Sequence, residues 1–194
     1  DVPYHLVLNP DVYYDCGVIE ELLEYMDKNH DVANVMPKVY YANGNLQYLC
    51  KMLPTPMELI VRRFIPFKNV VEKMNKRFEL HSSKYNKEIN IPYLSGCFML
   101  LRTKHLKDVG LFDENIFLHM EDLDLNRRLY MKYRTMFYPH TSIVHIHAKE
   151  SYKRKDQFIL HMKSAVYYFH KWGWFFDSAR KRINRELLKR IEEK

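Results

Sequence analysis

Glycine, cysteine and long apolar runs are all scarce in this chain of 194 residues. Only 5 glycines are present, and none forms a G-x-G-x-x-G or Walker-type pattern, which excludes the Gly-rich loops that cradle phosphates in many nucleotide-binding proteins. No uninterrupted apolar run approaches the ~20 residues that span a bilayer. Cys16, Cys50 and Cys97 are odd in number and lack metal-ligand spacing, which argues for a reducing compartment and against a disulfide scaffold or a Cys-based zinc site.

Apolar and aromatic residues are abundant instead. Hydrophobic residues make up 47% of the chain and charged residues 28%, so a sizeable buried core can form and global disorder is excluded. The chain opens without a charged-then-apolar signal segment and runs directly into a strand-like stretch. We therefore expect a fragment, or a protein that lacks its first half.

The positive charge lies at one end of the chain. Residues 1–148 contain 18 Lys/Arg and 18 Asp/Glu, whereas residues 149–194 contain 13 and 6, so the second segment carries the whole net charge of +7. This division predicts a catalytic region over 1–148 and a basic, aromatic, helical extension over 149–194. A basic extension on a neutral body indicates an anionic surface as its partner.

Apolar periodicity and turn residues predict an α/β arrangement. We expect strands at 5–8, 32–41, 93–101, 135–138 and 142–147, and helices at 18–28, 103–108, 121–133 and, with a break near 172–174, 156–194. Thr103 is the expected N-cap of the second helix, and Gly110 is its expected stop. The first strand is expected to be buried, with Asp11 presented beyond its C-terminal end.

Polar side chains stand at strand ends or helix starts, where open α/β sheets bind their ligands. They form three clusters: Asn9 with Asp11, Glu121 with Asp122 and Asp124, and His145 with His147. A hard divalent cation at the first cluster, with an imidazole from the third, would neutralise a diphosphate leaving group. A carboxylate of the second cluster would deprotonate an attacking hydroxyl.

Each cluster also has a purely structural interpretation. Asn-Pro-Asp is a common turn sequence, and acidic residues favour a helix N-terminus whatever their chemistry. Strand histidines are more often solvated or hydrogen-bonded than bound to metal. Only the conjunction of the three clusters in this order favours a catalytic site.

Longer motifs extend this pattern over nearly the whole chain. They are L-N-P-D-V at 8–12, Y-L-S-G-C-F-M-L-L-R at 93–102, G-L-F-D-E at 110–114, F-L-H-M-E-D-L-D-L at 117–125 and S-A-V-Y-Y-F-H-K-W-G-W at 164–174. Together they resemble family 2 glycosyltransferases, in particular the bacterial rhamnosyltransferase-like branch that builds cell-surface polysaccharides. The resemblance covers the C-terminal two-thirds of that family, whose nucleotide-binding first half should precede Asp1.

The resemblance implies a GT-A-like (Rossmann-like) mixed sheet flanked by helices, truncated at its N-terminus and followed by a helical extension. Asp11 matches the metal-binding carboxylate of the family's D-x-D element, and Asn9 stands where an acid is usual. His145 or His147 matches the late histidine that completes the coordination of Mg²⁺ or Mn²⁺.

The same resemblance assigns the remaining site residues. Asp122 matches the catalytic base of the E-D motif, with Glu121 as its neighbour. The Ser95-Gly96 turn lies where the acceptor approaches the donor sugar, since Gly permits close backbone approach. Two further residues, Asp124 and Arg128, are expected in the same vicinity.

The resulting hypothesis is an inverting glycosyltransferase that moves a sugar, with rhamnose as the candidate, from a nucleotide-diphosphate sugar to a glycan or lipid-linked acceptor. No nucleic acid is expected as a partner. Two alternatives stay open. The chain could be a non-catalytic fragment that keeps the acceptor half and the tail, or a basic nucleic-acid-binding module that uses Tyr and Arg.

The tail itself carries an apolar stripe over 158–169, an aromatic cluster over 172–176 and a basic helix after it. We expect the stripe to pack on the catalytic region. The aromatic cluster and the basic residues Arg180, Lys181, Arg182 and Arg185 are expected to dock the enzyme, from the cytoplasm, on the inner face of the cytoplasmic membrane. An oligomer contact is the alternative use of this surface.

Overall fold

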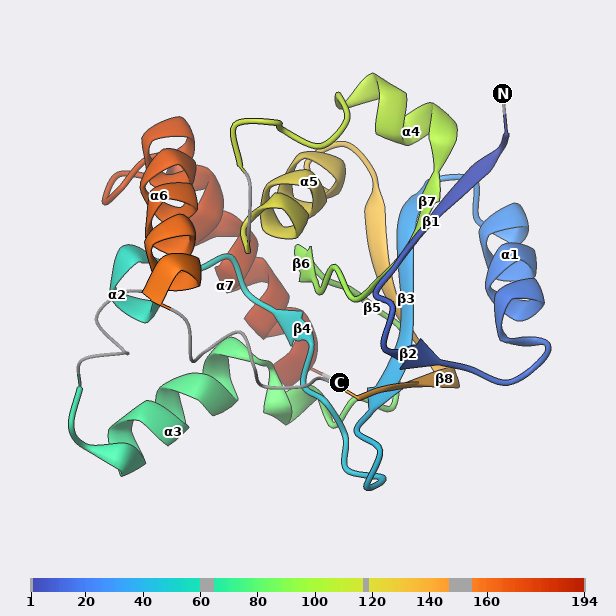
Figure 1. Ribbon diagram of the computed structural model, residues 1–194, viewed down its shortest axis with the longest axis horizontal. Helices are drawn as coiled ribbons and strands as arrows, with labels where there is room; N and C mark the ends of the chain where they lie inside the picture. The colour runs from blue at the N-terminus through green and yellow to red at the C-terminus, as the bar shows by residue number, and fades with distance from the viewer. Residues whose placement is uncertain (1, 60–64, 117–118, 147–154, 194) are drawn as a thin grey trace.

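Helices flank a central mixed sheet (Figure 1), as the sequence predicts. The computed structural model describes residues 2–59, 65–116, 119–146 and 155–193. Its strands are β1 (Tyr4–Leu8), β2 (Val12–Tyr13), β3 (Val32–Tyr40), β4 (Cys50–Lys51), β5 (Ile89–Asn90), β6 (Tyr93–Leu94), β7 (Phe98–Arg102) and β8 (Arg134–His145). Its helices are α1 (Val18–Lys28), α2 (Pro56–Leu59), α3 (Lys68–Phe78), the 3-10 turn η2 (His81–Ser83), α4 (Thr103–Asp108), α5 (Glu121–Tyr130), α6 (Lys155–Trp172) and α7 (Ser178–Glu192).

The strand order brings several strand ends to one edge of the main sheet. Strands pair in the order β1-β7-β3-β8-β2, with β5 added along β8. β3 and β8 are parallel, whereas β7 is antiparallel to both β1 and β3, so β1, β3 and β8 run in the same direction. The carboxyl ends of these strands, at Leu8, Tyr40 and His145, therefore lie at one edge with the start of β7.

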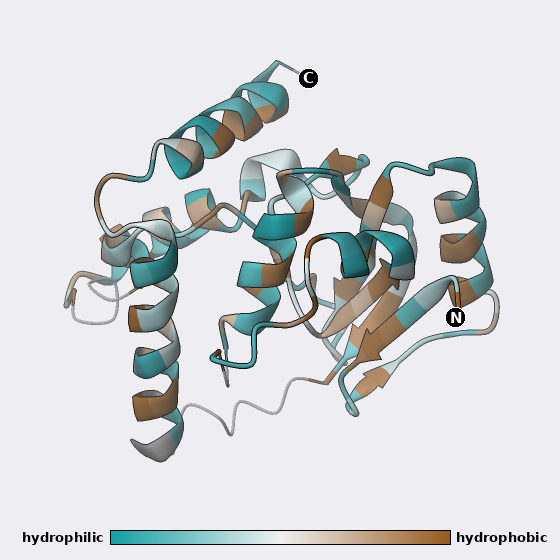
Figure 2. Ribbon diagram, turned by 90° about the horizontal axis from the view of Figure 1, so that it is seen from above, coloured by the Kyte–Doolittle hydropathy of each residue, from teal (hydrophilic) through white to brown (hydrophobic). Residues whose placement is uncertain are grey.

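Helices cover both faces of this sheet. α1 contacts β3 and β8 from one face, and α5 contacts the same strands from the other (Figure 1). α1 buries Val18, Leu22 and Met26 at a spacing of four residues, which places them on one side of the helix. α5 buries Leu125 and Leu129 in a separate apolar cluster. Apolar residues recur along the strands between the helices (Figure 2).

The expected strand 93–101 is two strands in different sheets. β6 pairs with β4, whereas β7 pairs with β1 and β3, and the chain turns between them at residues 95–97. The side-chain amide of Asn126 on α5 donates to the carbonyl oxygen of Leu94 at 2.9 Å and so holds the end of β6 against α5. Both pieces are largely buried and apolar, so periodicity alone could not separate them.

The two strands expected on either side of Pro139 are one strand, β8. Its pairing with β3 shifts register between Pro37 and Lys38, where Tyr138 and Ser142 are the successive partners. Residues 139–141 therefore form a bulge. A proline is tolerated there because a bulged residue donates no ladder hydrogen bond.

Three smaller expectations were also wrong. β1 is an edge strand within the described sheet, and its His5 and Leu6 are exposed rather than buried. Arg102 is the N-cap of α4 and Thr103 is its first residue, and the Thr103 hydroxyl is hydrogen-bonded to Nδ1 of His5. α5 ends at Tyr130, three residues before the expected end.

The C-terminal helices pack on the rest of the chain. Ala165, Tyr168 and Phe169 of α6 and Ile183 of α7 share an apolar cluster with Leu123 of α5. Of the stripe expected to pack on the catalytic region, Ala165 and Phe169 do so, whereas Ile159 and Val166 are exposed. None of the described helices has the length and apolar character needed to cross a bilayer. The division between 1–148 and 149–194 stays a prediction.

Candidate active site

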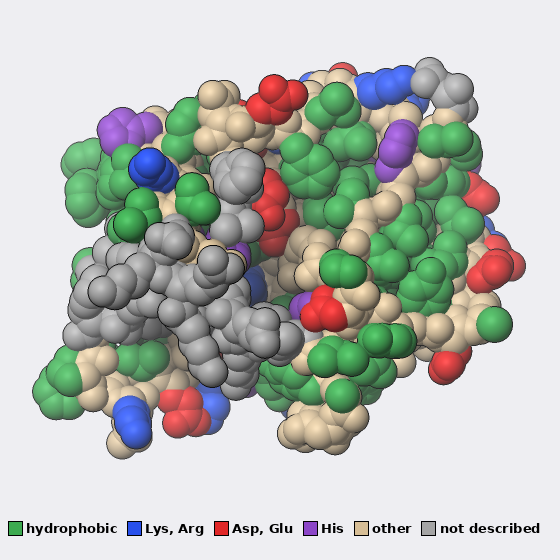
Figure 3. Space-filling view, in the orientation of Figure 1, with side chains coloured by type: hydrophobic (Ala, Val, Ile, Leu, Met, Phe, Trp, Pro, Cys, Tyr) green, Lys and Arg blue, Asp and Glu red, His purple; other side chains and the backbone are tan. Residues whose placement is uncertain are grey.

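A cavity of about 730 Å³ opens at the sheet edge where the strand ends meet. Figure 3 shows acidic and histidine side chains gathered beside a hollow near the middle of this face. Of the predicted site residues, seven line the cavity: Asn9, Asp11, Ser95, Gly96, Glu121, Asp122 and His145. The structure thus brings together groups that are separated by more than a hundred residues in the sequence, because β1, β8, the β6–β7 turn and the start of α5 all reach this edge.

One wall of the cavity holds Asp11 next to His145. Oδ1 of Asp11 lies 3.3 Å from Nε2 of His145, and the amide nitrogen of Asn9 lies 3.4 Å from the same Nε2. The pairing of β2 with β8 sets this geometry, because Val12 is the register partner of His145. Asp11 is partly exposed to the cavity, whereas the imidazole is buried.

Gln47 fixes the orientation of that imidazole. Its Nε2 donates to the carbonyl oxygen of His145 at 2.6 Å, which leaves its Oε1 to accept from Nδ1 of His145 at 3.1 Å. A neutral His145 that donates from Nδ1 turns the lone pair of Nε2 toward Asp11. Such an outer partner commonly orients a metal-binding histidine.

The donors on this wall fit a hard divalent cation that shares its remaining positions with phosphate and water. Mg²⁺ is usually held by one or two carboxylates together with substrate phosphates, and imidazole also binds Mn²⁺. In the part of the chain that the structure describes, no three His, Cys, Asp or Glu side chains form a complete metal cage. His147, the second predicted histidine ligand, lies outside the described residues.

The same cavity holds Asp122 at the first turn of α5. Its Oδ2 accepts from the backbone N–H of Gly96 at 2.8 Å, and its Oδ1 accepts from the N–H of Leu123 at 2.7 Å. The pKa of Asp122 is raised, first by burial and then by the neighbouring Glu121 carboxylate, while Lys51 and the two N–H donors oppose the rise. A carboxylate with a raised pKa is a stronger base, which suits proton abstraction near neutral pH.

Gly96 is required at the turn that faces this carboxylate. A Cβ built on Gly96 would lie 3.0 Å from Cβ of Asp122 and 3.3 Å from its Oδ2. Any side chain would therefore push the β6–β7 turn away from α5. The group that approaches Gly96 closely is thus Asp122, whereas the predicted approach of the acceptor to this turn stays a prediction.

Asp124 and Arg128, predicted near the sugar, do not line the cavity. The buried carboxylate of Asp124 accepts from Nε of Arg128 at 2.9 Å, from Nζ of Lys171 at 3.0 Å and from Nε1 of Trp172 at 2.7 Å. Arg128 also donates to backbone carbonyl oxygens in the segment 109–111. Both side chains are thus occupied in joining α5 to α6 and to the α4–α5 connection.

Ten of the cavity-lining residues were not among the predicted site residues, and Gln47, Lys51 and His119 are three of them. The Nζ of Lys51 lies 5.0 Å from the ring centre of Tyr93, and it places a cation in a cavity that also holds four acidic residues. His119 adopts a left-handed backbone conformation with φ +70, which is uncommon outside glycine and often marks a functional turn. The motif at 117–125 contains His119, but nothing in the sequence singled out Gln47 or Lys51.

The chain is 29% identical, over 128 residues, to N-acetylglucosaminyl-diphospho-decaprenol L-rhamnosyltransferase of Mycobacterium tuberculosis, with the same values for strains CDC 1551 / Oshkosh and H37Rv. The chain is similar to an L-rhamnosyltransferase. The match covers 64% of the chain, which spans about 40% of the length of these relatives. The predicted resemblance to the rhamnosyltransferase-like branch is thereby confirmed.

Two other comparisons add little to the similarity with this L-rhamnosyltransferase. No protein-family model matches the chain. Among solved structures, a crystal structure of GalNAc-T7 with UDP, GalNAc and Mn²⁺ has a TM-score of 0.49 and 13% identity, over 74% of this chain and 27% of the other.

Proposed function

We propose that the chain forms the catalytic region of a GT-A-like glycosyltransferase that moves a sugar, with L-rhamnose as the candidate, from a nucleotide-diphosphate donor to a glycan. The observation that supports this most directly is the composition of the cavity. A carboxylate of raised pKa, Asp122, shares it with the Asp11–His145 pair and with the cation Lys51. Asp122 suits the deprotonation of an acceptor hydroxyl, whereas the Asp11–His145 pair and Lys51 suit the binding of a diphosphate leaving group.

Asp122 acts as general base in a single, inverting displacement. The acceptor hydroxyl oxygen forms a bond to the anomeric carbon as the bond from that carbon to the diphosphate oxygen breaks, and the hydroxyl proton passes to the Asp122 carboxylate. The N–H donors of Gly96 and Leu123 hold both carboxylate oxygens, so the side chain keeps one orientation during the transfer. The Glu121 carboxylate supports the base by raising its pKa.

Other residues of the cavity position the leaving diphosphate. Asp11 and His145, with the Asn9 amide beside them, would hold a Mg²⁺ or Mn²⁺ ion. When bound, such an ion supplies positive charge that neutralises the diphosphate. Lys51 binds the same diphosphate as a point charge. Gln47 keeps Nε2 of His145 turned into the site.

The acceptor is a glycan on a polyprenyl diphosphate. The name of the mycobacterial relatives specifies N-acetylglucosamine linked through diphosphate to decaprenol as the acceptor and L-rhamnose as the transferred sugar. The same class of acceptor is proposed here because the match spans 128 residues.

A membrane-facing surface would serve such an acceptor. Phe175 and Phe176, at the turn between α6 and α7, are 67% and 96% exposed, whereas Trp174 packs inward against Phe169. The outer face of α6 adds a shallow apolar surface lined by Ile159, Met162, Lys163, Val166, Tyr167 and His170. These groups, with basic residues of α7, would dock the enzyme on the inner face of the cytoplasmic membrane.

One of the basic residues predicted to meet lipid must be removed from that surface. Arg180 is buried, because its guanidinium donates to the carbonyl oxygens of Pro54 and Trp174 and lies beside Asp177. Lys181, Arg182 and Arg185 remain exposed. The proposed lipid contact therefore rests on these three.

The decisive experiment measures acceptor-dependent release of nucleoside diphosphate by the full-length protein, with dTDP-rhamnose among the donors and a GlcNAc-diphosphoryl-polyprenol as acceptor. Asp122→Asn should lower kcat by ~10²–10⁴-fold, because it removes the base and keeps the shape. Glu114→Gln, at an exposed acid outside the cavity, is the matched control. Turnover by Asp122→Asn at the wild-type rate would reject Asp122 as base, and no turnover by any pairing would favour the non-catalytic fragment.

A further inference from the structure

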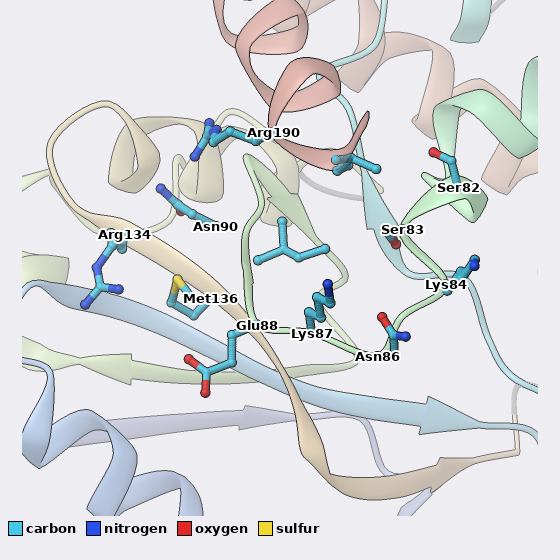
Figure 4. Close-up of a pocket in the computed structure, with 12 residues that line it drawn as sticks. Ser82, Ser83, Lys84, Asn86, Lys87, Glu88, Asn90, Arg134, Met136 and Arg190 are labelled. Carbon is cyan, nitrogen blue, oxygen red and sulfur yellow. The ribbon is translucent and has the colours of Figure 1, made fainter. Parts of the chain in front are cut away.

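A second cavity, of about 340 Å³, lies behind the loop that follows η2 (Figure 4). It is enclosed by the segment 82–90, the start of β8 and the last turns of α7. No residue lines both this cavity and the candidate active site. The two therefore require separate explanations.

Cationic side chains reach this cavity from three different elements. Lys84 and Lys87 come from the loop, Arg134 from the start of β8 and Arg190 from α7 (Figure 4). Glu88 is the one acid among the described lining residues. Its carboxylate is engaged by the hydroxyl of Tyr25 at 2.8 Å and by Nε2 of His140 at 3.4 Å.

The two arginines differ in how their charge is balanced. Arg134 forms a two-pronged ion pair with Asp31, at 2.5 and 2.6 Å, which neutralises it. Arg190 instead donates to two uncharged oxygens, the hydroxyl of Tyr130 at 2.6 Å and the carbonyl of Glu186 at 3.3 Å. These bonds orient the guanidinium without neutralising it. Arg190 therefore brings its positive charge to the cavity.

The loop that carries the lysines is held in one shape. Leu80, Lys84 and Tyr85 all have left-handed backbone conformations, with φ between +52 and +56, which side-chain-bearing residues rarely adopt. The buried hydroxyl of Tyr85 accepts from the N–H of Cys50 at 2.9 Å and donates to the carbonyl oxygen of Glu79 at 2.7 Å. These anchors keep the cavity formed in advance of any ligand, which lowers the cost of binding.

The other residues that line this cavity suit a small ligand with both polar and apolar parts. Ile89, Met136 and Ile191 provide apolar surface, and neighbouring serine hydroxyls and asparagine amides provide hydrogen-bonding groups. Its volume is at the lower end of the ~300–1,000 Å³ range of small-molecule pockets. We propose that this cavity binds a phosphate-bearing ligand of monosaccharide size, attracted by the positive charge of Lys84, Lys87 and Arg190 around the cavity, with the sugar part of the ligand over the apolar surface.

The test is calorimetric titration of the full chain with glucose 1-phosphate, inorganic phosphate and glucose. Glucose 1-phosphate should bind more tightly than either of the other probes. Arg190→Gln combined with Lys87→Gln should weaken that binding at least 10-fold. Lys84→Asn is an independent variant, because Asn tolerates the left-handed conformation of residue 84.

Two control variants distinguish the cavities. Lys51→Gln alters the candidate active site, and Lys104→Gln alters an exposed residue of α4. Both should leave the affinity for glucose 1-phosphate unchanged. Loss of binding in Lys51→Gln but not in the Arg190 and Lys87 variant would overturn the proposal. So would equal affinity for glucose, equal affinity for inorganic phosphate, or no measurable binding of any probe.

Discussion

The backbone N–H of Gly96 donates to Oδ2 of Asp122 across a gap that leaves no room for a side chain. One residue belongs to the turn between β6 and β7, and the other opens α5. The contact therefore fixes the distance between the sheet edge and the proposed base.

Gly96→Ala should separate these two surfaces. Its Cβ would meet Cβ of Asp122 at 3.0 Å, so either the turn or α5 must shift, at a cost of about 1–3 kcal/mol of stability. We expect kcat to fall by ~10²-fold, because a shift of the order of 1 Å at a catalytic group has that effect. Turnover and thermal unfolding would be measured on the same preparation.

Gly44→Ala provides the comparison for that variant. Gly44 has φ +80 and nothing near its Cβ position, so alanine there should cost stability through the backbone alone, by about 1 kcal/mol. Its kcat should stay at the wild-type value. Equal losses of activity in both variants would show that general destabilisation, rather than displacement of Asp122, explains the effect.

The pH dependence of kcat/KM should report the charges around Asp122. A base must be deprotonated, so its raised pKa moves the acid limb of the profile to a pH above the ordinary range of aspartate. Because Lys51 lowers this pKa and Glu121 raises it, Lys51→Gln should move the limb to higher pH and Glu121→Gln to lower pH. Shifts of the same sign in both variants would argue against Asp122 as the titrating group.

The same raised pKa has a consequence for stability. Between the unfolded and folded pKa values of Asp122 the folded state binds more protons, so its contribution to the free energy of unfolding decreases as the pH rises through that window. Asp122→Asn should remove this slope. Denaturant unfolding at several pH values, compared between Asp122→Asn and the wild type, measures it.

Metal binding should weaken when either a proposed metal ligand or the residue that orients one is replaced. Asp11→Ala should raise both the Mn²⁺ concentration needed for half-maximal rate and the KM for the donor, since the proposed ion links protein and diphosphate. Gln47→Leu should weaken apparent metal affinity by about 10–100-fold, because His145 loses its orienting partner. Asp15→Ala, at a nearby exposed acid, should change neither quantity. Unaltered metal titrations in the first two variants would remove Asp11 and His145 from the metal site.

Binding to anionic vesicles should depend on the α6–α7 turn and on α7. Replacing Phe175 and Phe176 with serine should reduce flotation with phosphatidylglycerol vesicles, and so should changing Lys181, Arg182 and Arg185 to Gln. Each basic group contributes about 1 kcal/mol near such a surface, so losing three should weaken binding by roughly 100-fold. High salt should act in the same direction.

Phe67→Ser is the control for this surface, because Phe67 is 69% exposed at the start of α3. It should float like the wild type. An equal loss of flotation in all three variants would indicate nonspecific hydrophobic adsorption to the vesicles. Wild-type flotation of the phenylalanine variant and of the basic-residue variant would indicate that this surface is an oligomer contact. Analytical ultracentrifugation would then detect the oligomer.

Much of the candidate site followed from position along the chain. Asn9, Asp11, Asp122 and His145 each stand at a strand end or a helix start, and parallel strands bring such ends to one edge. Position along the chain did not choose between Asp122 and Asp124, since residues two apart on a helix point in different directions and either could face the sheet. The resemblance to the E-D motif assigned the role of base to Asp122. Only the fold shows that Asp124 is taken by Arg128, Lys171 and Trp172.

Other features depend on contacts between distant segments and leave no local pattern. Gln47 acts on His145 across 98 residues of sequence. Arg180 looks like a surface charge in a basic helix, but it is drawn inside by carbonyl oxygens of Pro54 and Trp174. The predicted strand 93–101 is divided because its first part pairs with β4 and its second part pairs with β1 of the main sheet.

The buried pair of Arg127 and Asp177, at 2.8 Å, ties the far end of the base-bearing helix to the segment between α6 and α7. Removing one partner would leave an uncompensated charge in the interior, at a cost of about 3–5 kcal/mol. This ion pair thus joins α5 to the C-terminal helices. In chimeras between relatives, α5, α6 and α7 would have to be exchanged together. Deleting residues 149–194 to abolish lipid binding would also displace Asp122.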